Sequence, residues 1–154
     1  MTENSVCYYC DASFKETDDE KWFFLLRKVL YDSDYVEFNV HKKDFYKIPE
    51  IDSISKHIID TVKFKQKIYP RNKSISYQLN EDVIKFILSK KYTDWKNYYL
   101  EDISIFKNDL EIFATITHEN YIIMPLNADE YIDLNNKGYN FTYFLPTKHS
   151  VCRK

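Results

Sequence analysis

The C-terminal third of the chain carries the most regular hydrophobic pattern, and this pattern constrains the fold more than any other stretch. Over 110–117, apolar side chains recur with the two-residue period of a half-buried strand. Apolar stretches at 103–106, 121–126 and 139–145 predict three further strands, and polar turns separate the first three of the four. The pattern therefore predicts an antiparallel sheet made from segments that follow one another in the chain.

A short helix is predicted over 128–137, between the last two of these strands. Asn127 and Glu130 have the spacing of a capping box, in which two side chains satisfy backbone donors at a helix start. Gly138 is the only glycine of the chain, and it stands where the residue after a helix takes a left-handed conformation. We therefore expect Gly138 to have a positive φ.

Helical periodicity recurs in the N-terminal part of the chain, where apolar residues stand three and four positions apart. Thr17 and Glu20 have capping-box spacing at the start of the first of these stretches. Asn80 is a cap for the last of them. Helices are predicted near 18–31, 53–63 and 81–90.

Strand-like composition also appears upstream, at 6–14, 35–40 and 75–79. Residues 62–69 fit either the end of a helix or a strand, because their apolar and basic side chains alternate. Helices and strands are mixed along the chain and an antiparallel set follows them. This order favours a single α+β domain over 1–154 rather than a doubly wound sheet.

Composition and termini point to an ordinary folded protein. With 44% hydrophobic and 18% aromatic residues, the chain has ample material for a core. No basic-then-apolar leader is visible, and no apolar run approaches the roughly 20 residues of a membrane helix. Three cysteines, an odd number, favour reduced thiols. These features predict a soluble cytoplasmic protein.

The single glycine also excludes several kinds of catalytic site. Nucleophile elbows, phosphate-binding loops and dinucleotide fingerprints need glycines for tight turns and for close approach of the backbone to phosphate. The chain's one glycine is already assigned to a helix end. The sequence therefore predicts no cofactor and favours a protein without catalytic activity.

Four candidate zinc ligands lie near the two ends of the chain, in the spacings Cys7-x-x-Cys10 and His149-x-x-Cys152. Against a zinc site, an extended strand over 6–14 would point residues three apart to opposite faces. No glycine is present there to form a zinc knuckle. We therefore expect ordinary thiols and no metal at these positions.

The charges are spread unevenly. Residues 56–91 hold nine Lys or Arg against three acids, whereas 98–145 holds two Lys against eight acids. The basic segment could contact phosphates, although the net charge of −2 favours a solvated lysine face. The acidic segment could instead attract a basic protein. The candidates for nucleic-acid contact are Lys63, Lys65, Lys67, Arg71 and Lys73.

Acidic residues also surround the predicted turn at His118. With Glu101, Asp102 and Glu111 on adjoining strands, this histidine could support acid–base chemistry or a divalent metal. A His-Glu pair in a polar turn is more often simply solvated. No lysine follows Glu111 closely, which weighs against a two-metal nuclease.

The run Leu100–Phe106, the strand that ends at Thr117-His118-Glu119, the apolar third strand and the capped helix together resemble small cytosolic immunity proteins of bacterial polymorphic-toxin systems. The similarity covers about the last third of the chain. It implies a non-catalytic protein that binds and blocks a cognate toxin, often through acidic and aromatic surface residues. The corresponding candidates in this chain are Glu101, Asp102, Glu111, Phe113, His118 and Glu119.

The leading hypothesis is therefore a protein-binding module of the immunity or antitoxin type, which neutralises a partner protein. One alternative is a nucleic-acid-binding regulator that uses the basic segment 56–91. Another is a metal-dependent hydrolase around His118.

Overall fold

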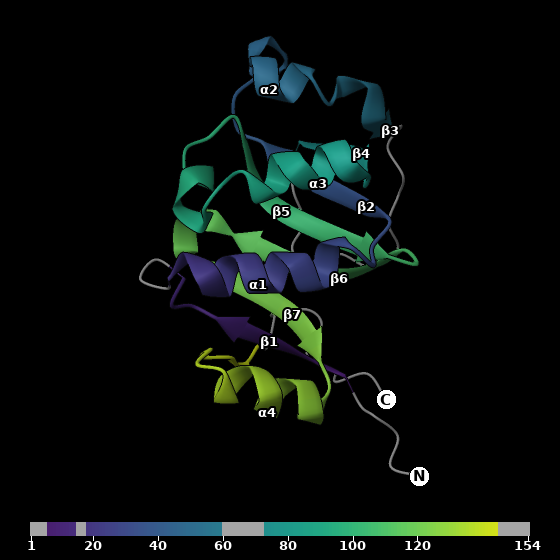
Figure 1. Ribbon diagram of the computed structural model, residues 1–154. Coiled ribbons are helices and arrows are strands. Elements are labelled where there is room, and N and C mark those ends of the chain that lie inside the picture. Colours follow the sequence, from purple (N-terminus) through teal and green to yellow (C-terminus); the bar gives the residue numbers. More distant parts are fainter. Residues whose placement is uncertain (1–5, 15–17, 60–72, 145–154) are drawn as a thin grey trace.

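The computed structural model describes residues 6–14, 18–59 and 73–144, and these form an α+β fold built on one sheet (Figure 1). The sheet has eight strands in the order β3-β4-β2-β5-β6-β7-β1-β8, and each neighbouring pair is antiparallel. The predicted fold class is confirmed. The strands are β1 (Cys7–Asp11), β2 (Tyr35–Val40), β3 (Ile58–Ile59), β4 (Ser74–Gln78), β5 (Leu100–Lys107), β6 (Leu110–Ile116), β7 (Tyr121–Leu126) and β8 (Thr142–Tyr143).

One pair of helices covers one face of the sheet, and a second pair lies at opposite ends of the molecule. Figure 1 shows α1 and α3 on the same face, with α2 and α4 at opposite ends of the molecule. Within the described ranges, none of the helices has the length and apolar character that crossing a bilayer requires. The α-helices are α1 (Asp19–Leu30), α2 (Pro49–Asp52), α3 (Glu81–Leu88) and α4 (Ala128–Asn136). The 3₁₀ turns are η1 (Phe45–Lys47), η2 (Ser55–His57), η3 (Tyr92–Trp95) and η4 (Thr117–Glu119).

The core lies between this sheet face and the helices α1 and α3. Trp22 is 1% exposed, and its indole N–H donates to the Lys90 carbonyl at 3.0 Å, which ties α1 to the end of α3. Phe38 of β2 stacks on Trp95 of η3, with 5.5 Å between ring centroids. Burying each such aromatic side chain contributes roughly 1.5–3 kcal/mol. Aromatic packing therefore holds the helices on the sheet.

The start of α1 differs by one residue from the predicted capping box. Asp18, not Thr17, is the N-cap, and its carboxylate accepts a hydrogen bond from the Lys21 N–H at 3.0 Å. An aspartate at this position also adds negative charge at the positive end of the helix dipole.

Both ends of α4 are as the sequence predicts. The Asn127 side chain accepts from the Glu130 N–H at 2.8 Å, and the Glu130 carboxylate accepts from the Asn127 N–H at 2.9 Å. Gly138 has φ +97°, directly after the C-cap Lys137. The predicted positive φ is confirmed.

The helix predicted near 53–63 is wrong over the residues described. Pro49, which is well suited to the first helical position, starts the short α2 earlier in the chain, and a 3₁₀ turn and β3 follow. Ile51 and Ile54 are buried, whereas Ile58 is 45% exposed. The isoleucines therefore do not form one continuous helical face. The ambiguous stretch 62–69 lies outside the described residues.

The strand predicted over 139–145 is shorter, because β8 contains only Thr142 and Tyr143. The preceding backbone N–H groups donate to side chains instead of a neighbouring strand: that of Asn140 to the buried Asp11 carboxylate and that of Phe141 to Asn135, both at 2.8 Å. The buried side chains of Tyr139 and Phe141 instead anchor a turn that packs into the core.

Candidate functional site

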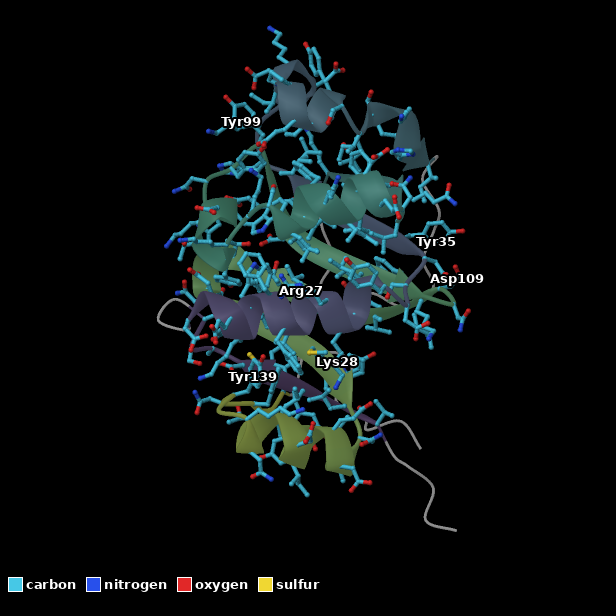
Figure 2. The ribbon with its side chains drawn as sticks, in the orientation of Figure 1. Arg27, Lys28, Tyr35, Tyr99, Asp109 and Tyr139 are labelled. Carbon is cyan, nitrogen blue, oxygen red and sulfur yellow. The ribbon has the colours of Figure 1, made fainter. Side chains whose placement is uncertain are left out.

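Three side chains that can bind metals meet at one end of the sheet: His41, Glu101 and His118. Tyr99 lies at this end, and its carbonyl accepts a hydrogen bond from the His41 N–H at 3.0 Å. Figure 2 shows Tyr99 far from Asp109, which lies in the turn at the other end of β5. The histidines and the glutamate come from separate parts of the chain, and sheet pairing brings them together.

The Glu101 carboxylate is the centre of this group. Its Oε2 atom lies 3.0 Å from His118 Nε2 and 3.7 Å from His41 Nδ1. The three candidate ligand atoms all lie within 4.8 Å of one another. The Glu101 side chain is only 2% exposed, whereas those of His41 and His118 are 36% and 50% exposed. The group is thus a buried carboxylate with two imidazoles on its solvent side.

Backbone contacts fix the Glu101 carboxylate in place. Its Oε1 atom accepts a hydrogen bond from the Asn97 N–H at 2.5 Å, which leaves Oε2 for the histidines. Asn97 has φ +63°, a left-handed conformation that asparagine tolerates better than most residues. The next residue, Asp102, accepts from the Thr117 N–H at 2.8 Å and so holds the start of η4, which carries His118.

The predicted pairing of His118 with a strand carboxylate is therefore present with Glu101. Glu111 lies elsewhere, at the far end of the β5–β6 hairpin, where its carboxylate accepts a hydrogen bond from Ser104. His41 was missed. Its position directly after the predicted strand 35–40 was visible in the sequence, but its approach to Glu101 depends on the antiparallel pairing of that strand with β5, which sets Asn39 opposite Glu101.

Most of the residues predicted to contact a partner are inside the fold. Glu101, Asp102, Glu111 and Phe113 are 9% exposed or less, so a partner cannot reach them in this conformation. His118 and Glu119 are exposed. The surface of the C-terminal segment is therefore less acidic than its sequence suggests, because three of its acids are buried.

Of the four candidate zinc ligands, Cys7 and Cys10 lie in the described part of the chain. Cys10 is a buried free thiol, and burial, followed by the nearby charges of Asp11 and Glu119, raises its pKa to about 11. Cys7 is disulfide-bonded, so the expectation of a reduced thiol is wrong there. His149 and Cys152 lie outside the described residues.

Of the predicted nucleic-acid contacts, Lys73 is described and exposed. Lys63, Lys65, Lys67 and Arg71 fall within 60–72, outside the described residues.

A second histidine–carboxylate contact lies beside α3. His57 Nε2 is 3.0 Å from an oxygen of Asp82, and His57 Nδ1 is 2.7 Å from the Asn80 amide nitrogen. Asn80 also caps α3, as predicted, by accepting from the Val83 N–H at 3.1 Å. The amide can only donate through its nitrogen, so this arrangement fits the tautomer with the proton on His57 Nε2.

An open groove runs along the outer side of α1. It has a volume of about 990 Å³ and includes Phe24, which is 43% exposed. Figure 2 shows Arg27 and Lys28 on α1, with Tyr139 below the helix. The lining residues are Asp18, Asp19, Glu20, Lys21, Phe23, Phe24, Arg27, Lys28, Lys137 and Tyr139.

Comparison with protein-family models, curated proteins and solved structures finds no match to this chain.

Proposed function

We propose that this chain is a non-catalytic module that binds another protein, and that the partner docks in the groove along α1. The observation that carries this proposal is Phe24, a large aromatic side chain 43% exposed within an open hollow of about 990 Å³. Aromatic residues in recessed surfaces are typical anchors of protein interfaces. The groove is open along the helix, which suits a partner side chain or segment.

The charges around the groove indicate what the partner presents. Lys137 Nζ lies 5.1 Å from the centre of the Phe24 ring, and the Arg27 guanidinium lies 5.7 Å from that of Phe23. Cations therefore stand beside both aromatic rings. The groove also contains Asp18, Asp19 and Glu20, so a partner surface with an apolar centre and charges of both signs around it would complement the groove. A basic partner stays a prediction from the sequence, since Glu101, Asp102 and Glu111 of the acidic segment are buried whereas other acids of that segment are exposed.

The C-terminal third of the chain resembles bacterial immunity proteins. This resemblance supports a toxin as the partner and the bacterial cytoplasm as the place of action. Neutralisation would follow from occupying a toxin surface, and no catalytic step by this chain is required.

The test compares two exposed apolar residues on different helices. Phe24→Ser removes the proposed anchor, and Ile132→Ser is the matched control because Ile132 on α4 is 54% exposed and is not among the groove residues. We expect a partner captured from the source cells to bind the wild type and Ile132→Ser, and to bind Phe24→Ser at least about tenfold more weakly. A partner that binds both variants equally would overturn docking in the groove.

A second measurement tests neutralisation itself. The identified partner is expressed alone and together with wild-type protein, and growth of the host cells is recorded. We expect growth inhibition by the partner and relief by the wild type but not by Phe24→Ser. Recovery of nucleic acid instead of a protein, with binding lost between about 50 and 200 mM salt, would favour the basic segment 56–91 as the functional surface.

A further inference from the structure

His41, Glu101 and His118 together offer three metal-binding atoms, and partner binding at α1 does not use them. The buried Glu101 carboxylate already has a partner at each oxygen, the Asn97 N–H at Oε1 and His118 Nε2 at Oε2. His41 Nδ1 lies 3.7 Å from the same oxygen, beyond hydrogen-bonding distance. The second imidazole therefore adds no direct hydrogen bond to this carboxylate oxygen.

A metal ion would use all three side chains at once. Zinc binds imidazole nitrogen and carboxylate oxygen at about 2.0–2.2 Å, which separates neighbouring ligand atoms of a tetrahedral site by roughly 3.3 Å. The distances from the Glu101 oxygen, 3.0 and 3.7 Å, lie on either side of this value. All three ligand atoms are within 4.8 Å of one another, so rotations of the exposed imidazoles suffice to close the site.

The carboxylate is already oriented for this role. The Asn97 N–H holds Glu101 Oε1, so that Oε2 points towards the histidines. Such outer contacts fix the orientation of metal ligands and tune their affinity. The histidines are partly exposed, which provides a path of entry and leaves a fourth position for water.

We propose that His41 Nδ1, Glu101 Oε2 and His118 Nε2 bind one divalent transition-metal ion of the zinc type. Two histidines and one glutamate form a ligand set that zinc accepts in proteins. The His118 Nε2 lone pair becomes available when the imidazole carries its proton on Nδ1. This inference is independent of the proposed docking at α1, because none of these three residues lines the groove.

The test uses full-length protein without an affinity tag, stripped of metal by a chelator and dialysed. Zinc chloride is titrated calorimetrically, and cobalt chloride is titrated while its visible absorption is recorded. We expect one ion per chain, with a cobalt spectrum of low coordination number. His41→Ala and His118→Ala are each expected to weaken binding by about tenfold or more, since each removes one of three ligands.

The matched control is His57→Gln. His57 also has a carboxylate neighbour at 3.0 Å, but within the described residues it does not belong to a group of three possible metal ligands. This variant should bind zinc as the wild type does. Glu101→Gln is the third ligand variant, and its circular dichroism is checked first because the site is buried.

Two results would overturn the proposal: no stoichiometric binding by the wild type, or unchanged binding by both His41→Ala and His118→Ala. Both histidines are at least 36% exposed in their side chains, so these variants are expected to fold. Partner capture is measured separately with Phe24→Ser, and failure of one proposal is therefore distinguishable from failure of the other.

Discussion

The contacts of His118 with Glu101 and of His57 with Asp82 have the same length, 3.0 Å, but very different surroundings. The Glu101 side chain is 2% exposed and that of Asp82 is 57% exposed. Glu101 has a second imidazole nearby, whereas Asp82 has the Lys56 ammonium at 3.9 Å. The first contact is made to a buried carboxylate at one end of the sheet, and the second is made to an exposed carboxylate on α3.

The comparison teaches that distance alone does not determine what a histidine–carboxylate contact is worth. An exposed pair is weakened by water and salt, so its contribution to stability is small. A buried carboxylate that loses its partners keeps its desolvation cost, so it affects both stability and ligand binding. The following predictions test this distinction, from the largest effect to the smallest.

Glu101→Ala should lower the free energy of unfolding by about 3 kcal/mol. The substitution leaves the Asn97 N–H without its acceptor and removes a fully packed side chain. Urea denaturation monitored by circular dichroism measures the change. Asp82→Ala is the matched variant at the exposed contact, and a loss of equal size there would break the comparison.

Zinc should stabilise the protein through the His118–Glu101 contact and not through the His57–Asp82 contact. At a free zinc concentration about 100 times the dissociation constant, binding to the folded state adds about 2.7 kcal/mol to the free energy of unfolding. We expect this gain in the wild type and in His57→Gln, and at most about half of it in His118→Ala, which should bind zinc about tenfold more weakly or worse. The unfolding midpoint with and without zinc reports it. An undiminished gain in His118→Ala would show that zinc acts through other ligands.

Sequence reasoning succeeded where the relevant contacts are local. The capped ends of α4 were predictable because Asn127, Glu130 and Gly138 act on backbone groups a few residues away. The approach of His118 to Glu101 was also foreseeable, because β5 and β6 form a hairpin. Short-range geometry is encoded in residue spacing.

Sequence reasoning failed where the outcome depends on distant pairing or on burial. His41 reaches Glu101 only through the pairing of β2 with β5, and no spacing in the chain reveals that pairing. The burial of Glu101, Asp102 and Glu111 was unexpected, because acidic residues are usually exposed. Asp102 has φ +51°, and the β5–β6 register shifts at Ile105 and Phe106, so simple alternation does not assign faces there.

Asn80→Ala should cost about 1 kcal/mol, mainly through loss of the α3 cap. Asn127→Ala removes an equivalent cap on α4 with no histidine attached, and it is expected to cost about the same. The excess for Asn80 measures the contact of its amide with His57. We expect that excess to be at most about 0.5 kcal/mol in urea denaturation. A much larger excess would mean that the contact between Asn80 and His57 contributes substantially to stability.

Asp82→Asn should have the smallest effect, and the effect should depend on pH. The hydrogen bond from His57 holds the pKa of Asp82 below its usual range; burial opposes this shift, and the charges of Lys56, His57 and Lys85 add to it. Because the folded-state pKa is lowered, the stabilisation is fully present above the ordinary aspartate pKa. It is lost as the pH falls through the lowered value.

The difference in unfolding midpoint between wild type and Asp82→Asn should therefore shrink as the pH is lowered from 7 towards 3. Part of the difference at pH 7 comes from negative charge in the first turn of α3, which interacts favourably with the helix dipole. Both contributions are exposed to solvent, so added salt at pH 7 should also reduce the difference. If the difference grows on acidification or is unaffected by salt, the His57–Asp82 contact behaves like a buried contact. The distinction between it and the His118–Glu101 contact would then be wrong.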